Sequence, residues 1–239
     1  MLIHGAFEKA KRYIEAQSEL KEEQFGKKEQ GVCVTISRQA GAGGNTVSNI
    51  LLNSLEPLRK KNTPSWTLFD KNLIEKVIED NRLPKALLEI MDESNFTAVT
   101  SIVNELMTGQ PDPWALMHKT FETILQIAQM GSVVVIGRGS NFITANYQNV
   151  FHVRLIAPFE QRVTHVEHHY KISHKEALEA VKKDDAARKY FVRKFFHKDI
   201  NDPVNYHIMI NTSQTGFEGA AKIISCAVLE QFQSKFLKI

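Results

Sequence analysis

Five short runs of β-branched and aromatic residues alternate with longer segments of helical periodicity along this chain of 239 residues. The strand-like runs cover residues 32–37, 66–69, 132–136, 150–156 and 207–210. Parallel strands must be joined by long crossovers, usually helices, so this alternation is typical of a parallel sheet covered on both faces. The sequence therefore predicts an α/β fold of three layers around a five-stranded parallel sheet.

The intervening segments have the apolar spacing of helices. They cover residues 44–60, 71–80, 84–107, 114–130, 158–169, 174–197 and 216–236. Ser173, followed three residues later by Glu176, predicts a capping box at the start of the sixth helix. No repeat or Pro-rich linker divides the chain, so we expect one domain over residues 31–239, preceded by a helical extension over residues 1–30. Phe7, Tyr13 and Ile14 of this extension would dock on the core or on a second subunit.

Composition excludes several classes of protein. With 43% hydrophobic and 24% charged residues, the chain has the composition of an ordinary globular protein. Its 30 basic and 27 acidic side chains leave a net charge of +3, too small for the phosphate-tracking surface of a nucleic-acid binder. Two cysteines and no long apolar run argue against a disulfide framework, a signal peptide or a membrane span. We expect a cytoplasmic protein with no membrane and no nucleic-acid partner.

A glycine-rich turn follows the first predicted strand and precedes a predicted helix. In such a turn, backbone N–H groups and the helix N-terminus converge on a phosphate, although a turn that binds nothing is the alternative. Against the Walker A pattern, Gly43 stands at the second glycine, Gly44 at the lysine and Asn45 at the magnesium-binding Ser/Thr. The phosphate-binding lysine is therefore missing.

Two further segments place arginines where they could grip a phosphate. Arg138 follows the third predicted strand between two glycines, although a salt bridge within its loop is the alternative. Between residues 162 and 198, basic side chains are interleaved with aromatic ones, and Asp184 and Arg188 lie four residues apart. The alternatives there are a solvated helical face and a mobile lid that closes over phosphates. His165, His168 and His169 have helical spacing but no nearby cysteine, so we do not predict a metal site.

Five segments in this order resemble the cytidylate kinase-like family of P-loop nucleoside monophosphate kinases, over about residues 31–236. The matching segments are VTISRQAGAGGNTVS at 34–48, LFDKNLIEKV at 68–77, VVVIGRGSNFI at 133–143, VFHVRLIAPFEQRV at 150–163, and residues 182–224. The resemblance implies a P-loop kinase fold with a helical acceptor-binding insertion at about 71–130 and a lid at about 184–203. It also implies ATP and Mg²⁺ as cofactors and nucleotides as partners. The oligomeric state stays open, with a homodimer as one option.

The resemblance also assigns site residues. Asp70 and Arg138 would bind the acceptor, and Thr46 would bind Mg²⁺. The donor phosphates would be held by Arg38, Gly41, Ala42, Gly43, Gly44, Asn45 and Thr46. The catalytic arginines would be Arg138, Arg162, Arg188 and Arg193.

Three departures from the family pattern leave the function open. Gly44 replaces the lysine, and Ile136 and Gly139 stand where cytidylate kinases carry acids. Arg38 would supply the missing positive charge. The leading hypothesis is phosphoryl transfer from ATP to a nucleoside monophosphate, with CMP or dCMP as the first candidate. The alternatives are a kinase of another small phosphate or hydroxyl metabolite and a nucleotide-binding regulatory protein or pseudokinase.

Overall fold

The computed structural model describes residues 8–14, 31–60, 63–79, 115–137 and 139–237. Five parallel strands form one sheet in the order β2-β3-β1-β4-β5. They are β1 (Cys33–Arg38), β2 (Thr67–Phe69), β3 (Val133–Ile136), β4 (Val150–Ile156) and β5 (Ile208–Asn211). The predicted strands are confirmed to within one residue at each end.

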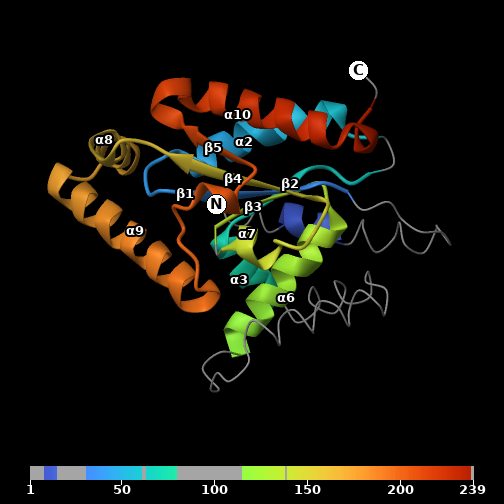
Figure 1. The fold of residues 1–239 in the computed structure, drawn as a ribbon, viewed down its shortest axis with the longest axis horizontal. Coiled ribbons are helices and arrows are strands. Elements are labelled where there is room, and N and C mark those ends of the chain that lie inside the picture. The colour runs from blue at the N-terminus through green and yellow to red at the C-terminus, as the bar shows by residue number, and fades with distance from the viewer. Residues whose placement is uncertain (1–7, 15–30, 61–62, 80–114, 138, 238–239) are drawn as a thin grey trace.

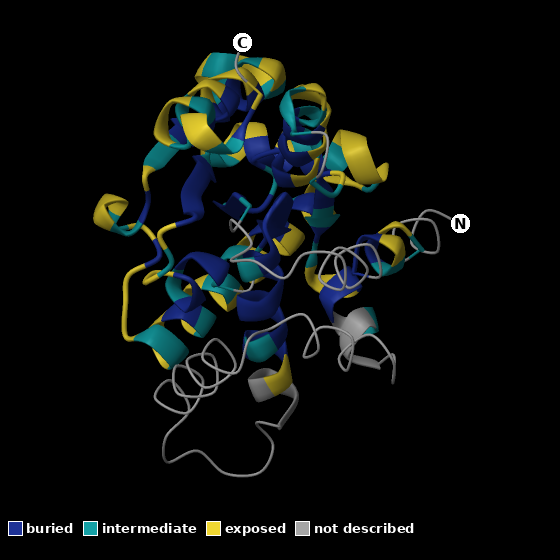
Figure 2. Cartoon of the chain, turned by 90° about the vertical axis from the view of Figure 1, so that its right-hand side faces the viewer, coloured by how far each residue is buried: buried dark blue, intermediate teal, exposed yellow. Residues whose placement is uncertain are grey.

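Helices cover both faces of this sheet (Figure 1). On one face lie α2 (Gly44–Leu55) and α10 (Thr212–Gln231), and on the other lie α3 (Lys71–Glu79), α6 (Ala115–Met130) and α7 (Ser140–Ile143). Successive residues of a strand point to opposite faces, so Val133 and Val135 enter one core while Val134 and Ile136 enter the other. The predicted three-layer architecture is therefore confirmed, and Figure 2 shows its buried residues gathered between the layers.

Two helices form a hairpin beside the sheet rather than a layer on it. They are α8 (Phe159–Tyr170) and α9 (His174–Phe196), and they pack together through Val163, Val166, Ala177 and Val181. The predicted capping box is present: the Ser173 hydroxyl accepts from the Glu176 amide, and the Glu176 carboxylate accepts from the Ser173 amide. The far end of α9 is held by Phe195 and Phe196, which pack on Phe121 of α6.

Several helix boundaries differ from the predictions. The first helix stops at Leu55, and a 3₁₀ turn over Glu56–Leu58 replaces its predicted end because Pro57 supplies no backbone donor. Helix α10 includes an unpredicted first turn from Thr212, capped by Asn211, but Gly216 has non-helical backbone angles (φ 68°, ψ 175°) that interrupt the helix at the residue where the prediction begins. The short helix α7 was not predicted, and within the predicted lid α9 already ends at Phe196. The helix predicted at 84–107 lies outside the described residues.

Part of the N-terminal extension packs on the core. Residues 8–14 are helical, and Ala10, Tyr13 and Ile14 are buried in the same apolar cluster as α6 and β3. The Tyr13 hydroxyl donates to the Gly131 carbonyl, and its ring meets Phe69 edge-on at 5.9 Å between centroids. Tyr13 and Ile14 therefore dock on the core of their own chain, which is one of the two predicted possibilities. Phe7 lies outside the described residues. No helix in the described part of the chain has the length and apolar character needed to cross a membrane.

Candidate functional site

The turn after β1 has the geometry of an anion-binding loop. Gly41 and Gly43 have φ values of 80° and 77°, in the left-handed region that favours glycine. A Cβ on Gly43 would overlap the Phe217 ring, and one on Gly41 would overlap the Arg162 backbone, so both positions require glycine. Gly43 caps α2 without a side-chain hydrogen bond, which leaves amides of the first helical turn open to a ligand.

A cavity of about 490 Å³ opens above this turn, and we call it the loop cavity. One wall contains Gly41, Gly43, Gly44, Asn45 and Thr46. The other wall comes from α8 and α9 and carries Val166, Ile172 and Val181 beside three ring side chains. The loop cavity therefore has backbone and polar groups at the glycine turn, and apolar and ring side chains with Asp184 and Arg188 at the helical hairpin.

The ring side chains of α8 form a continuous row along the loop cavity. His165 and His169 stack with centroids 5.7 Å apart, and His169 meets Tyr170 edge-on at 4.8 Å. His165 also contacts the Phe217 ring at 5.1 Å, and Phe217 lies against Gly43. Partial burial and the neighbouring His169 lower the pKa of His165, which favours its neutral ring. A flat aromatic group could stack on this row.

A second cavity of about 350 Å³ lies at the carboxyl ends of β1 and β3, and we call it the strand-end cavity. Its polar lining comes from Ser37, Lys71 and Asn141, and its apolar lining from Ile136, Phe191, Val192 and Ile200. Arg38, Asp184 and Arg188 line both cavities. These three side chains are therefore the common wall between them.

Arg38 occupies the space that a glycine at the lysine position leaves free. Its side chain crosses Gly44, where an added Cβ would come within 3.0 Å of the Arg38 Cγ atom. Its guanidinium reaches Gly137, at the end of β3, where an added Cβ would overlap Nη1. Burial, reinforced by the charge of Arg188, lowers the pKa of Arg38 to about 10. Arg38 thus stays charged at neutral pH at the junction of the cavities.

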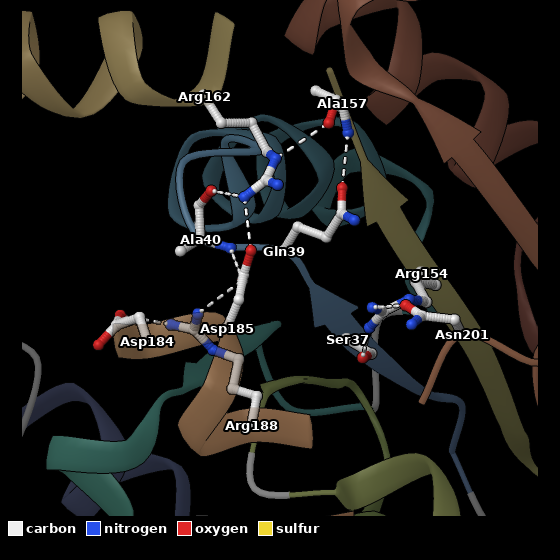
Figure 3. Close-up of polar contacts among 10 residues, drawn as sticks. All are labelled: Ser37, Gln39, Ala40, Arg154, Ala157, Arg162, Asp184, Asp185, Arg188 and Asn201. Carbon is white, nitrogen blue, oxygen red and sulfur yellow. Dashed lines mark hydrogen bonds and ion pairs between the residues drawn. The ribbon is translucent and has the colours of Figure 1, made fainter. Parts of the chain in front are cut away.

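Arg188 of α9 lines both cavities, and Figure 3 shows its guanidinium beside Asp184 and Asp185. Its Nη2 donates to the Asp184 carboxylate at 2.9 Å, and its Nη1 lies 3.5 Å from an Asp185 oxygen. That Nη1 is buried and makes no hydrogen bond to the described residues. The spare donor suits a ligand oxygen at the junction.

Arg162 lies behind the loop rather than in either cavity. Its guanidinium is buried and donates to the Ala157 and Ala40 carbonyls, each at 2.9 Å, and to Asp185 at 2.6 Å (Figure 3). The other Asp185 oxygen accepts from the Ala40 amide at 2.7 Å. Arg162 and Asp185 therefore fasten α9 to the loop, and Arg162, which was predicted as a catalytic residue, lines neither cavity.

The other predicted residues are scattered. Arg193 is exposed and lines neither cavity, and Ala42 is buried beneath the loop. Asp70 accepts from the Leu73 amide at 2.8 Å at the start of α3 and lines neither cavity, although its charge acts on Arg38. Arg138 lies outside the described residues. Sequence reasoning missed Ser37, Lys71, Asn141 and the ring row; only the four-residue spacing of His165 and His169 on a predicted helix was a usable signal.

Comparison with known proteins places this geometry in a family. No curated protein matches the chain. A solved structure of an uncharacterized protein from Eubacterium ventriosum superposes with a TM-score of 0.65 at 18% identity, covering 84% of this chain and 99% of the other. A shikimate kinase from Bacteroides thetaiotaomicron gives a TM-score of 0.44 at 13% identity, over 84% of this chain and 98% of that one.

The family comparison covers the site itself. The profile of the cytidylate kinase-like family matches residues 33–214, which include the glycine turn, both cavities and the helical hairpin. Together with the parallel five-stranded sheet and its flanking helices, this match establishes a P-loop kinase-like α/β fold and supports a kinase of small molecules. The chain therefore belongs to the cytidylate kinase-like family.

Proposed function

We propose that this protein transfers a phosphoryl group from ATP to a nucleoside monophosphate, with CMP or dCMP as the first candidate. The observation that carries the proposal is the common wall of Arg38, Asp184 and Arg188 between two cavities. A kinase must hold two anionic substrates with the reacting groups in line and neutralise the charge between them. Two cavities that meet at two arginines provide that arrangement.

The loop cavity suits the donor nucleotide. Its glycine turn and the open amides of α2 can hold the phosphates, and the row of His165, His169 and Tyr170 can stack on the base. A ligand with an anionic end and a flat aromatic end matches this division of the cavity. Its volume of about 490 Å³ lies within the usual range of small-molecule sites.

Positive charge at the junction would replace the missing lysine. Arg38 crosses Gly44 and ends between the cavities, so its guanidinium can bind the transferring phosphoryl group. Arg188 would add a second cation from α9. Mg²⁺, bound with the donor, would neutralise phosphate charge. It needs few protein ligands because it keeps water and phosphate oxygens, and the half-buried Thr46 on the cavity wall is the hydroxyl that fits.

The strand-end cavity suits an anionic acceptor. Arg38, Lys71 and Arg188 line it with Asp184 as the one carboxylate among its described lining residues. Its described lining contains no feature that selects a particular base, so the choice of CMP or dCMP rests on the family.

A coupled assay of ADP release over a panel of nucleoside monophosphates tests the proposal. We expect turnover with at least one pyrimidine monophosphate. Arg188→Ala should lower kcat at least about a hundredfold because it removes a cation from the junction. Arg193→Ala is the matched control, since Arg193 is an exposed arginine of the same helix that lines neither cavity. No turnover with any monophosphate would refute the proposal.

A nucleotide sensor is the second candidate, favoured by Gly44 at the lysine position of the Walker A pattern and by Ile136 and Gly139 where cytidylate kinases carry acids. Calorimetry distinguishes the two functions. A sensor would bind ATP without turning over any monophosphate or any other small phosphate or hydroxyl acceptor. Loss of turnover in Arg188→Ala with ATP binding preserved would instead support the kinase.

A further inference from the structure

A buried arginine beneath the strand-end cavity makes no ion pair with the described residues. Arg154 of β4 is 2% exposed, and its donors meet two neutral acceptors: Ser37 Oγ at 2.8 Å and Asn201 Oδ1 at 2.9 Å (Figure 3). Its Nε is buried and makes no hydrogen bond to the described residues. Its guanidinium lies 5.7 Å from the centroid of the Tyr206 ring. The charges of Asp185 and Asp199 act on this guanidinium without forming an ion pair, so its hydrogen bonds within the described residues go to neutral groups.

Arg162, another buried arginine of this region, does form an ion pair. Arg162, which is 5% exposed, is neutralised by Asp185 at 2.6 Å. A buried charge without a partner is strongly destabilising, so proteins rarely keep one that has no function. Arg154 has no such contact, because Asp185 and Asp199 act on its charge only from beyond ion-pair distance, and this leaves it able to polarise a neighbouring hydroxyl.

Ser37 connects this charge to the strand-end cavity. It faces Arg154 across the β1–β4 register, and it is one of the residues that line the cavity. The Tyr206 hydroxyl lies 3.4 Å from Ser37 Oγ but also lies 2.8 Å from the Ile200 carbonyl, the better acceptor for its single proton. The Ser37 hydroxyl oxygen therefore accepts a hydrogen bond from Arg154. The Ser37 hydroxyl proton can be donated only to the distant Tyr206 oxygen, among these neighbours, or to a ligand. A hydroxyl that accepts from a cation becomes a stronger donor.

We propose that Ser37 binds an anionic oxygen of the acceptor in the strand-end cavity and that Arg154 is the positioning residue that orients and polarises its hydroxyl. The inference rests on the proposed function for the identity of the acceptor. The anionic group is a phosphate or a carboxylate, since either offers the oxygen that Ser37 would donate to. Ser37 does not line the loop cavity, so the donor should not depend on it.

Calorimetry on the full chain, with the loop cavity saturated by Mg²⁺ and a non-hydrolysable ATP analogue, tests the inference without turnover. The probes are CMP, inorganic phosphate and acetate. Ser37→Ala should raise the Kd of the bound anion about tenfold or more, which corresponds to losing one hydrogen bond to a charged group. The Kd of the ATP analogue, measured alone, should not change. Ser225→Ala is the control, because Ser225 is a buried serine of α10 that lines neither cavity.

A double-mutant cycle separates the role of Arg154 from a purely structural one. Arg154→Gln should weaken the same anion about as much as Ser37→Ala, Arg154→Lys should restore part of the affinity, and the double variant should be no worse than Ser37→Ala alone. Where CMP is turned over, the loss should appear in the KM of the acceptor and not in that of ATP. Circular dichroism confirms that each variant is folded.

Four results would overturn the inference. They are unchanged anion affinity in Ser37→Ala, additive effects in the double variant, an equal loss of ATP affinity, and a wild-type protein that binds none of the three probes. Failure of the proposed function has a different signature. In that case no monophosphate is turned over, while inorganic phosphate or acetate still binds in a manner that depends on Ser37.

Discussion

Asp185 offers the sharpest test of how the helical hairpin is fastened to the glycine turn. Its carboxylate joins three partners from different segments: the Ala40 amide at 2.7 Å, Arg162 at 2.6 Å and Arg188 at 3.5 Å. Asp185→Asn keeps the shape and most hydrogen-bonding capacity of the side chain but removes its charge. Arg162, which is 5% exposed, would then be buried without a counter-charge.

The expected cost follows from this burial. Breaking a fully buried ion pair by removing one partner costs about 3–5 kcal/mol. The Asp185 side chain is 29% exposed, so solvent reduces the figure, and we expect about 2–3 kcal/mol of lost unfolding free energy. For a domain of this size that corresponds to a fall in Tm of about 5–10 °C.

The preceding residue supplies the control. Asp184 pairs with Arg188 at 2.9 Å, but its side chain is 59% exposed, and an exposed pair at this helical spacing contributes about 0.3–0.5 kcal/mol. Urea denaturation and differential scanning calorimetry of Asp185→Asn and Asp184→Asn would compare the two directly. If Asp185→Asn destabilises no more than Asp184→Asn, the fastening role of the Arg162–Asp185 pair is wrong.

Three further predictions concern the donor and the sheet. In steady-state assays, Arg38→Ala should lower kcat about a hundredfold, and Arg38→Lys should recover part of the loss. A kcat of Arg38→Ala equal to that of wild type would contradict the proposal that Arg38 replaces the missing lysine. In calorimetry, His165→Ala should raise the Kd of ATP about fivefold or more and leave the Kd of tripolyphosphate unchanged. The control His168→Ala, at an exposed position of the same helix, should match wild type. An equal loss of affinity for both ligands in His165→Ala would exclude base stacking. Burial, with the charge of His207, lowers the pKa of His152 from 6.5 to about 4, so its unfolded form binds the extra proton between these values. The contribution of His152 to the free energy of unfolding should be complete above pH 6.5 and fall toward pH 4 by up to about 3 kcal/mol. Denaturation curves of His152→Asn should therefore show a flatter dependence of stability on pH than wild type, and a steeper dependence would contradict this cause.

Local pattern determined the architecture and the glycine-rich turn. Every strand from 33–38 to 208–211 was predictable because β-branched runs between helical segments fit only a sheet buried on both faces. The left-handed conformation of Gly41 and Gly43 follows from residue type at a strand-to-helix turn. Helix ends were less predictable, since the turn of α10 between Thr212 and the break at Gly216 depends on the Asn211 cap rather than on apolar spacing.

Tertiary structure alone decided what each arginine does. Arg38, Arg162 and Arg188 have the same side chain, and the sequence placed all three around phosphates. The fold puts Arg38 and Arg188 at the junction of two cavities and buries Arg162 against Asp185 and two carbonyls. Likewise, Ser37 and Arg154 are 117 positions apart and meet only through the β1–β4 register. The partners of such buried arginines come from segments that are distant in the sequence. No local sequence pattern can therefore predict them.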